Sequence, residues 1–509
     1  MMTKINNFSG KWKVESGMRN VCCRVISFLF PLSSFLLPFS SYLFTACDDY
    51  IDITPKGAIT VDSTYQYYEL IVNPMRSYNP SAFWHLTDDA FAKESNILGY
   101  ENLSFHGINY TFNEKADRTI LPDNNLYENM YAYIMRSNLV IDNIDDTQGA
   151  EDMKALAKAE ARTFRAFDHF LAVNTYAKAY DPNTAAQDGG VAIMDHYTLE
   201  DTPPKASVAE VYDFIIKDLE ESVALLQEKP VNIYHPNRAF GYALLAKVYL
   251  FHCDWEKAKA AAETAMKLNS TLVDYNVIKD AGGVARYTNY NHENNPEVLS
   301  YHWMGSGWTT EQVALYYYGL ISPELKALFE PNDLRYSLFL RDTGTSITSW
   351  FDSGSGGAIW TPATTTNRFT YMSMGLRTAE VYLILAEANA RLNNLSEAVK
   401  YVNQLRAKRL SGDDTAIATP TSQVEMIKTI INERRKELLF GFNRFFDLKR
   451  FNLEPEYAKT ITRDYPVTNA SESRPRQTYT LRPDSRLYII PFPHSARDKN
   501  PNLTLNTDE

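Results

Sequence analysis

Cysteine, histidine and basic charge are all scarce in this sequence. Its 509 residues include four cysteines and nine histidines, and 62 acidic side chains outnumber 51 basic ones, for a formal net charge of −11. So few cysteines exclude a disulfide-stabilised scaffold. An acidic chain repels phosphate backbones, so we expect no nucleic-acid partner. The hydrophobic content of 45% is nevertheless ordinary for a large globular protein.

Catalytic and metal-binding motifs are also missing. No nucleophile elbow, zinc-binding His-Glu-x-x-His or phosphate loop is present, and the glycines near 354–357 lack the Lys-Ser/Thr of a P-loop. His292, Glu293 and His302 form only a loose trio, so we expect no metal site and no cofactor. In a chain so rich in acids, some pair of carboxylates always lies at the separation that glycosidases use. The number of acidic residues therefore does not distinguish a glycosidase from a binding protein. We expect a protein that is not an enzyme, with a glycoside hydrolase as the alternative.

The N-terminus has the pattern of an export signal. Residues 25–46 carry no charge and are largely apolar, and Arg19 and Arg24 precede them. This predicts a signal peptide over residues 1–46. A membrane-anchoring helix is the alternative, which Pro31 and Pro38 disfavour. Because residues 1–17 are polar, Met18 is an alternative start of translation.

The end of this segment resembles a lipoprotein processing site. Leu43-Phe44-Thr45-Ala46-Cys47 is similar to a bacterial lipobox, which predicts lipidation of Cys47; the alternative is an ordinary signal with a chance cysteine. Asp48-Asp49 resembles the acidic export tag of surface lipoproteins. Loss of residues 1–46 removes five basic residues and one acidic residue, which leaves a formal charge of −15. Acyl chains, rather than attraction to anionic lipid, must then hold the mature chain at the membrane.

Helical periodicity dominates the rest of the chain. Residues 122–145, 152–177 and 207–227 are predicted helices, the last with a capping box at Ser207 and Glu210. Two helix pairs share a pattern at an offset of 140 residues: Tyr242, Leu245, Ala246, Tyr249 with Ala258, Ala262, Ala265, and Tyr382, Leu385, Ala386, Asn389 with Ala398, Val402, Leu405. This predicts a mainly α, tetratricopeptide-like helical-repeat scaffold. Two unrelated hairpins with Ala-rich faces are the alternative.

A large insertion separates the two pairs. Residues 270–370 are rich in Asn, Gly, Ser, Thr, Tyr and Trp, and they hold Trp303, Trp308, Trp350 and Trp360. Long segments without periodicity are usually functional or disordered. We therefore predict a loop-rich ligand lobe inserted in the scaffold.

The C-terminal third resembles a known family. Residues 432–451, NERRKELLFGFNRFFDLKRF, look like the signature helix of the SusD/RagB family, the surface nutrient-binding lipoproteins of Bacteroidetes. Gly441, Phe442 and Phe445 depart from the family pattern. Further blocks agree: Glu160-Ala161-Arg162, Val211-Tyr212, Arg377-Thr378-Ala379-Glu380 and Asn500-Pro501-Asn502-Leu503. From charge and spacing, we interpret Arg434, Arg435, Arg444 and Arg450 as structural residues that pair with Glu433, Glu437 and Asp447 to pin helices together.

The resemblance implies an organisation and a function. Residues 47–509 are expected to form one SusD-like domain, an α-α superhelix with the ligand lobe around 270–370. The protein would sit lipid-anchored on the outer face of the outer membrane, bind a glycan or oligosaccharide, and deliver it to a SusC-like, TonB-dependent transporter. A receptor for a peptide or glycopeptide is the alternative.

Aromatic side chains are the candidate ligand contacts. Sugar C–H faces stack on aromatic rings, while sugar hydroxyls need polar partners. The candidates are Trp84, Tyr110, Trp303, Trp308 and Trp360, and Tyr316-Tyr317-Tyr318 is a weaker one. For each, packing in the core or within a loop is the competing interpretation.

Overall fold

The computed structural model describes residues 61–72, 76, 78, 84–91, 105–119, 126–283, 294–302, 320–340, 375–439, 441–466 and 475–508. These residues belong to one compact unit, Val61–Glu509. The predicted signal peptide and Cys47 lie outside the described residues, as do Trp303, Trp308 and Trp360. Among the helices of the described ranges, none combines the length and apolarity that a membrane crossing requires.

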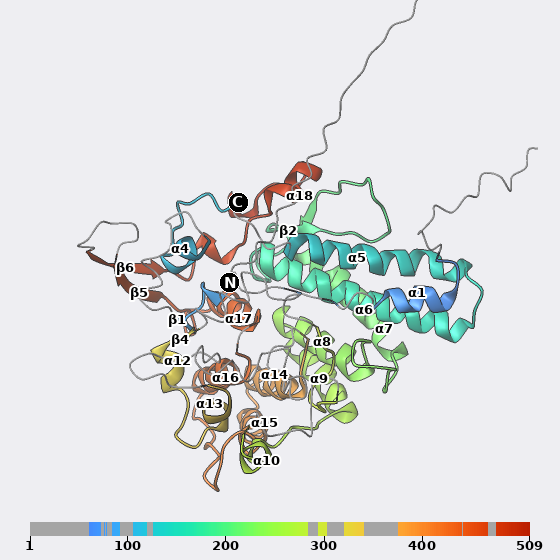
Figure 1. Ribbon diagram of the computed structural model, residues 1–509. Helices are drawn as coiled ribbons and strands as arrows, with labels where there is room; N and C mark the ends of the chain where they lie inside the picture. Colours follow the sequence, from blue (N-terminus) through green and yellow to red (C-terminus); the bar gives the residue numbers. More distant parts are fainter. Residues whose placement is uncertain are drawn as a thin grey trace, which may run out of the picture. The chain divides into compact units, whose positions relative to one another are not determined.

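A row of helices packed side by side forms the N-terminal half (Figure 1). The three helices predicted there are confirmed, with ends shifted by a few residues, and Ser207 and Glu210 form the expected capping box. The long helix α6 is buried along most of its length because α5 and α7 pack on either side of it. The row consists of α1 (Thr64–Leu70), α5 (Leu126–Asn143), η2 (Ile144–Asp146), α6 (Glu151–Tyr176), α7 (Val208–Ser222) and η3 (Val223–Leu225), whereas α4 (Phe105–Tyr110) lies apart from it, near residues 461–466 and 476–481.

The two predicted helix pairs form antiparallel hairpins. The first is α8 (Arg238–Phe251) with α9 (Trp255–Leu268), the second is α14 (Thr378–Arg391) with α15 (Leu395–Arg406), and α9 packs on α14. Their turns repeat the same hydrogen bonds 140 residues apart, since Asp254 N donates to Tyr249 O and Asn394 N donates to Asn389 O. Cys253 and Asn393 hold the equivalent left-handed positions, with φ of 64° and 60°. The repeat of turn geometry is consistent with tetratricopeptide-like repeats.

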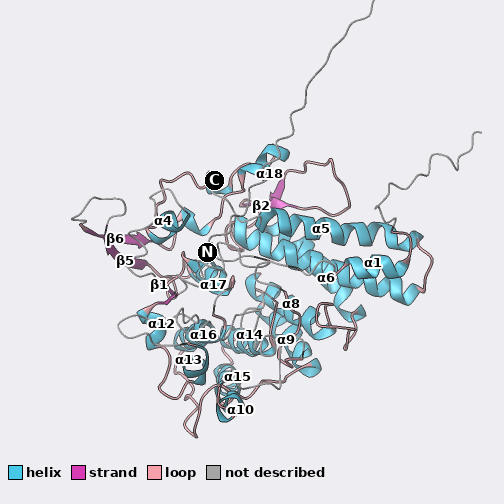
Figure 2. Ribbon diagram, in the orientation of Figure 1, coloured by secondary structure: helices cyan, strands magenta, loops and turns pink. Residues whose placement is uncertain are grey.

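Further elements follow each hairpin. They comprise α10 (Tyr275–Asp280), α12 (Pro323–Ala327), α13 (Leu334–Phe339), α16 (Gln423–Glu437), α17 (Asn443–Phe451), η4 (Arg486–Tyr488), α18 (His494–Lys499) and η5 (Asn506–Asp508). The strands of the described residues pair as three antiparallel two-stranded ribbons (Figure 2). These are β1 (Ala90–Phe91) with β4 (Leu320–Ile321), β2 (Gly189–Ala192) with β3 (Lys205–Ser207), and β5 (Ile461–Pro466) with β6 (Arg476–Leu481). The fold is therefore mainly helical, as predicted.

The interpretation of residues 432–451 as one helix is wrong. The structure ends α16 at Glu437 and begins α17 at Asn443. Gly441 lies between them at a φ of 63°, a left-handed conformation that an α-helix does not contain. Ile427, Leu438 and Phe445 therefore do not share one helical face, although all three are buried.

Candidate functional site

The arginines of the signature segment pin helices together as predicted, but of the predicted partners only Asp447 pairs with them. Arg434 donates to both carboxylate oxygens of Asp447, at 2.7 and 3.1 Å, and so joins α16 to α17. Arg444 forms a bidentate pair with Asp88, at 2.7 and 2.8 Å. Arg450 pairs in the same way with Glu387 of α14. The structural role expected of these residues is confirmed by their contacts.

A second set of ion pairs joins the described chain segments that border residues 303–319 and 341–374. We call it the root cluster, and it consists of Glu297, Asp333, Arg335, Arg377, Arg409 and Glu437. Three chain segments that border residues 303–319 and 341–374 contribute to it: 294–302, 320–340 and 375–377. Three cations face three carboxylates, so the cluster is balanced in charge.

Arg409 is the centre of the root cluster. Its guanidinium donates to Glu297 Oε1 at 2.8 Å, to Glu437 Oε2 at 3.0 Å and to the carbonyl oxygen of Val273 at 2.8 Å. Its carbonyl oxygen accepts from Leu334 N at 2.9 Å, and its side chain lies over the ring of Tyr275, 4.0 Å from the centroid. Each of its three nitrogens has an acceptor, so this fully buried cation is paired and hydrogen-bonded.

Arg377 joins the segment that ends at residue 302 to the segment that begins at residue 375. It donates to Glu297 Oε2 at 3.1 Å and to the carbonyl oxygen of Glu437 at 2.8 Å. Beside it, Val298 and Arg377 form an antiparallel bridge, and Leu299 N donates to Leu376 O at 3.0 Å. The two segments approach so closely that a Cβ on Gly375 would lie 1.8 Å from the carbonyl oxygen of Ser300.

Three arginines keep the Glu437 carboxylate charged. Burial acts to raise the pKa of Glu437, but Arg409, Arg377 and Arg335 together outweigh it and lower the pKa to about 2. At neutral pH the three arginines therefore face an ionised carboxylate. This arrangement holds segments 294–302, 320–340 and 375–377 together.

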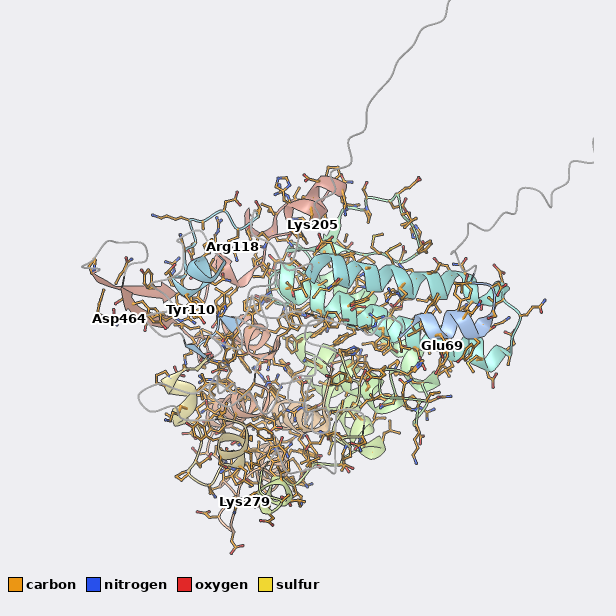
Figure 3. The ribbon with its side chains drawn as sticks, in the orientation of Figure 1. Glu69, Tyr110, Arg118, Lys205, Lys279 and Asp464 are labelled. Atoms are coloured by element: carbon orange, nitrogen blue, oxygen red, sulfur yellow. The ribbon has the colours of Figure 1, made fainter. Side chains whose placement is uncertain are left out.

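Two of the predicted ligand residues lie within the core. Trp84 is 2% exposed and packs in the main hydrophobic cluster. Tyr110 is fully buried beside Tyr465, and the ring of His85 lies 4.3 Å from its own (Figure 3). The structure thus brings Trp84-His85 and Tyr110 together and gives both aromatics packing contacts. Their role as ligand contacts stays a prediction, as it does for Trp303, Trp308 and Trp360 outside the described residues.

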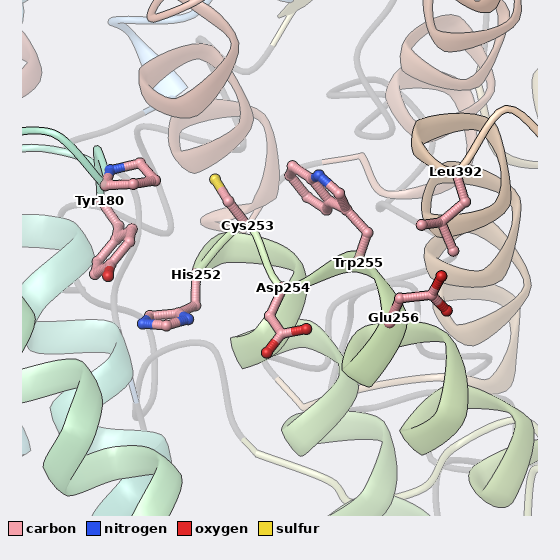
Figure 4. Close-up of a pocket in the computed structure, with 8 residues that line it drawn as sticks. Tyr180, His252, Cys253, Asp254, Trp255, Glu256 and Leu392 are labelled. Atoms are coloured by element: carbon pink, nitrogen blue, oxygen red, sulfur yellow. The ribbon is translucent and has the colours of Figure 1, made fainter.

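One open pocket of the described residues has an aromatic lining. We call it the hairpin pocket, because it lies where the α8–α9 and α14–α15 turns meet the segment after α6 (Figure 4). It encloses about 380 Å³, within the range of small-ligand sites. Its walls are Tyr180, Pro182, His252, Cys253, Asp254, Trp255, Glu256 and Leu392.

The hairpin pocket combines ring faces with polar groups. The rings of Tyr180 and His252 lie 4.3 Å apart, and the Arg391 guanidinium lies 4.9 Å from the centre of the Trp255 ring. His252 Nδ1 is buried and has no hydrogen-bond partner within the described ranges. Burial lowers the pKa of His252, so the imidazole is neutral and able to accept or donate one hydrogen bond. Such a lining suits a ring that carries hydroxyl groups.

Burial favours the protonated form of the pocket thiol. Burial raises the pKa of Cys253 to about 11, so the reactive thiolate is scarce at neutral pH. Asp254 is engaged as the N-cap of α9, where it accepts from Lys257 N at 3.2 Å. In the ranges that the structure describes, no group of three or more His, Cys, Asp or Glu side chains has the geometry to hold a metal ion.

Sequence reasoning missed several of these residues. Glu297 and Asp333 belong to segments without periodicity, and nothing near them in sequence identifies their partners. His252 and Trp255 stand at a turn that was predicted, but the pocket also needs Tyr180 from a different part of the chain. Of the root cluster, only Glu437 in the signature segment and Arg377 in a family-like block carried a signal in the sequence.

Comparisons with known proteins cover most of the chain. Residues 334–508 match the model of the SusD family, and residues 49–250 match a family described as starch-binding and associating with the outer membrane. Two similar proteins come from Formosa agariphila. SusD-like protein P2 is 26% identical, with 74% of this chain and 78% of that protein covered, and SusD-like protein P38 is 23% identical, with 75% and 87% covered.

Solved structures share the fold. A SusD-like carbohydrate-binding protein from Bacteroides vulgatus has a TM-score of 0.65 and 23% identity, and the match covers 88% of this chain and 98% of that one. A SusD superfamily protein from Bacteroides thetaiotaomicron also has a TM-score of 0.65, with 20% identity and coverage of 87% and 98%. At these identities the likeness concerns the fold.

Proposed function

Because the chain belongs to the SusD/RagB family, we propose that it is a lipid-anchored, glycan-binding protein of the outer-membrane surface. The observation that carries this proposal is the family match itself, since one of the two matching families is described as starch-binding and associating with the outer membrane. The Bacteroides vulgatus neighbour is likewise called a carbohydrate-binding protein. Acylation of Cys47 would supply the membrane anchor.

We place the glycan at the ligand lobe. The root cluster supports this placement, because it holds three segments that lead into the lobe on one rigid set of buried ion pairs. Binding residues on loops gain precision from a rigid scaffold beneath them. The hairpin pocket is the second candidate location, supported by its volume and its aromatic lining.

Delivery to a TonB-dependent, SusC-like transporter is the further step that we propose. A lipid tether keeps the binding protein beside its partner and so raises the effective concentration of bound nutrient there. Co-purification of the full-length protein from detergent-solubilised outer membranes tests this step. A TonB-dependent barrel should be recovered with the wild-type chain and lost with Cys47→Ala, whereas recovery of the protein without any barrel contradicts it.

Titration calorimetry on the mature chain tests the ligand class. A panel of neutral and acidic oligosaccharides is titrated beside a panel of peptides of similar length. We expect saturable heat with at least one oligosaccharide. Heat with peptides alone would favour the peptide receptor, and release of reducing sugar from a bound glycan would support a hydrolase instead.

A further inference from the structure

A second, smaller pocket lies near the C-terminus. It forms between residues 115–119 and the segments around Arg486, Pro491 and Leu505, and it encloses about 230 Å³. We call it the C-terminal pocket; Arg118 in Figure 3 marks its position. Its charged lining residues are Lys115, Asp117, Arg118 and Arg486. The cations therefore outnumber the carboxylates in its wall, in a chain whose formal net charge is −11.

Arg118 is a buried cation that is held by carbonyl groups. Its side chain donates to the carbonyl oxygens of Arg486 at 3.0 Å, Leu487 at 3.3 Å and Ile489 at 2.7 Å, and the residue is 8% exposed. Within the described residues it forms no ion pair. Arg444 and Arg450 are as deeply buried, but each is neutralised by a bidentate carboxylate. The positive charge of Arg118 is therefore held in place by carbonyl groups, and the nearby Glu114 carboxylate offsets part of it without a direct ion pair between the two described residues.

Neighbouring charges add to this excess. Burial and the nearby Arg486 lower the pKa of Arg118 to about 10, which leaves it charged at neutral pH. The exposed Lys115 and Arg486 form no ion pair with any other described residue. The Asp117 carboxylate accepts through Oδ1 from Thr119 N at 2.9 Å and Thr119 Oγ1 at 2.7 Å, and its charge offsets one of the three cations. Like charges held this close favour an anion between them.

We propose that the C-terminal pocket binds a single sulfate or phosphate group. Arg486 and Lys115 would donate charge-assisted hydrogen bonds to it, and Arg118 would supply a fixed positive charge at the pocket wall. The volume admits one tetrahedral group and part of its carrier. The group could come from a sulfated sugar or from an anionic lipid head group, and this site does not depend on where the glycan binds.

Titration of the mature chain with sodium sulfate at constant ionic strength tests the site. We expect saturable binding that weakens roughly tenfold or more in Arg486→Gln, because one charge-assisted hydrogen bond is lost. Arg482→Gln is the matched control: Arg482 is exposed on the same segment, and it already faces Asp484 at 3.2 Å. Arg118 is left intact, since its three carbonyl contacts support the fold.

Two further probes identify the carrier. Galactose 6-sulfate is compared with galactose, and vesicles of phosphatidylcholine with 20% phosphatidylglycerol are compared with phosphatidylcholine alone, where the lipid ratio is roughly that of an anionic leaflet. Binding of either anionic probe that is reduced in Arg486→Gln supports the site and names its source. Equal sulfate affinity of the wild type, Arg486→Gln and Lys115→Gln overturns the proposal.

Discussion

At the residue scale, Cys253 and Asn393 occupy the same place in two equivalent turns. Both have a left-handed φ, of 64° and 60°. Asparagine tolerates this conformation, whereas other residues with a Cβ are strained in it. The turn at Asn393 therefore serves as a comparison for the conformational strain at Cys253.

Cys253→Asn should stabilise the protein by about 1 kcal/mol, because it removes that strain. Chemical denaturation of the mature chain measures the change. The reverse substitution, Asn393→Cys, should destabilise by a similar amount. Equal stability of all three proteins would show that the turns carry no such strain.

Arg409→Met removes the central cation of the root cluster and leaves Glu297 and Glu437 without one of their partners. Loss of one member of a buried ion pair typically costs about 3–5 kcal/mol. We expect a loss of this size in urea denaturation. Lys400→Met is the control, because Lys400 and Glu397 are exposed and such pairs contribute about 0–1 kcal/mol. A similar small effect in both variants would refute the central role of Arg409.

Only some of the ion pairs could be predicted from the sequence. The charges of the signature segment were enough to predict that its arginines pair with acids such as Asp447, but not which arginine pairs with which acid. Arg444 and Asp88 are 356 residues apart, so no local pattern connects them. The burial of Trp84 and Tyr110 was equally hidden, because an aromatic side chain suits both a core and a ligand.

At the element scale, the close crossing of residues 298–302 and 375–377 depends on Gly375. A Cβ there would meet the Ser300 carbonyl, which is backbone and cannot turn away. Gly375→Ala should therefore destabilise the protein by more than about 2 kcal/mol and weaken glycan binding. Gly412→Ala, where the Cβ meets nothing within 4 Å and only the φ of 83° is strained, should cost about 1 kcal/mol and leave binding unchanged. Chemical denaturation measures the stability of the two variants, and titration calorimetry measures their glycan binding. Equal losses in Gly375→Ala and Gly412→Ala would contradict this role of Gly375.

The junction between α16 and α17 predicts a loss of stability in acid. Burial acts to raise the pKa of Asp447, but Arg434 and Arg450 outweigh it and lower the pKa to about 2. The unfolded carboxyl group titrates near pH 4, so the unfolded chain binds more protons between about pH 4 and pH 2. The stabilisation from Asp447 is thus complete above about pH 4 and is lost as the pH falls through 2.

Denaturation midpoints between pH 6 and pH 2 measure this dependence. Asp447→Asn should be less stable at pH 6 and should lose less stability on acidification than the wild type. Glu397→Gln, at an exposed pair, should keep the wild-type slope. If the denaturation midpoints of the wild type and Asp447→Asn fall in parallel as the pH is lowered, Asp447 does not cause the loss of stability in acid.

Long, regularly patterned helices were predictable as elements, and short or interrupted ones were not. The period of apolar residues and the Ser207 capping box gave α5, α6 and α7 nearly complete. The break at Gly441 was missed because charged and apolar residues continue across it with helical spacing. The β5–β6 ribbon was missed because its outward residues are mostly exposed and carry little apolar alternation.

At the scale of the whole molecule, a mainly helical family fold carries a cluster of buried ion pairs between segments far apart in the sequence. The mainly helical scaffold was predictable from periodicity, and the family from the signature segment. The contacts that hold the lobe were not, since Glu297, Asp333, Arg377 and Arg409 come from four separate segments. The root cluster can therefore be identified only from the three-dimensional structure.

The central claim is that the ligand lobe, rather than the hairpin pocket, holds the glycan. Calorimetric titration of an oligosaccharide that binds the mature chain tests it with two variants: the combined Trp303→Ala, Trp308→Ala and Trp360→Ala, and Tyr180→Ala in the hairpin pocket. Base-line stability of each variant is measured in parallel. The account predicts that the lobe variant loses binding by about 100-fold or more, given that each stacked aromatic contributes about 1 kcal/mol, while Tyr180→Ala binds as the wild type does. Unchanged affinity of the lobe variant, or a loss confined to Tyr180→Ala, would contradict it.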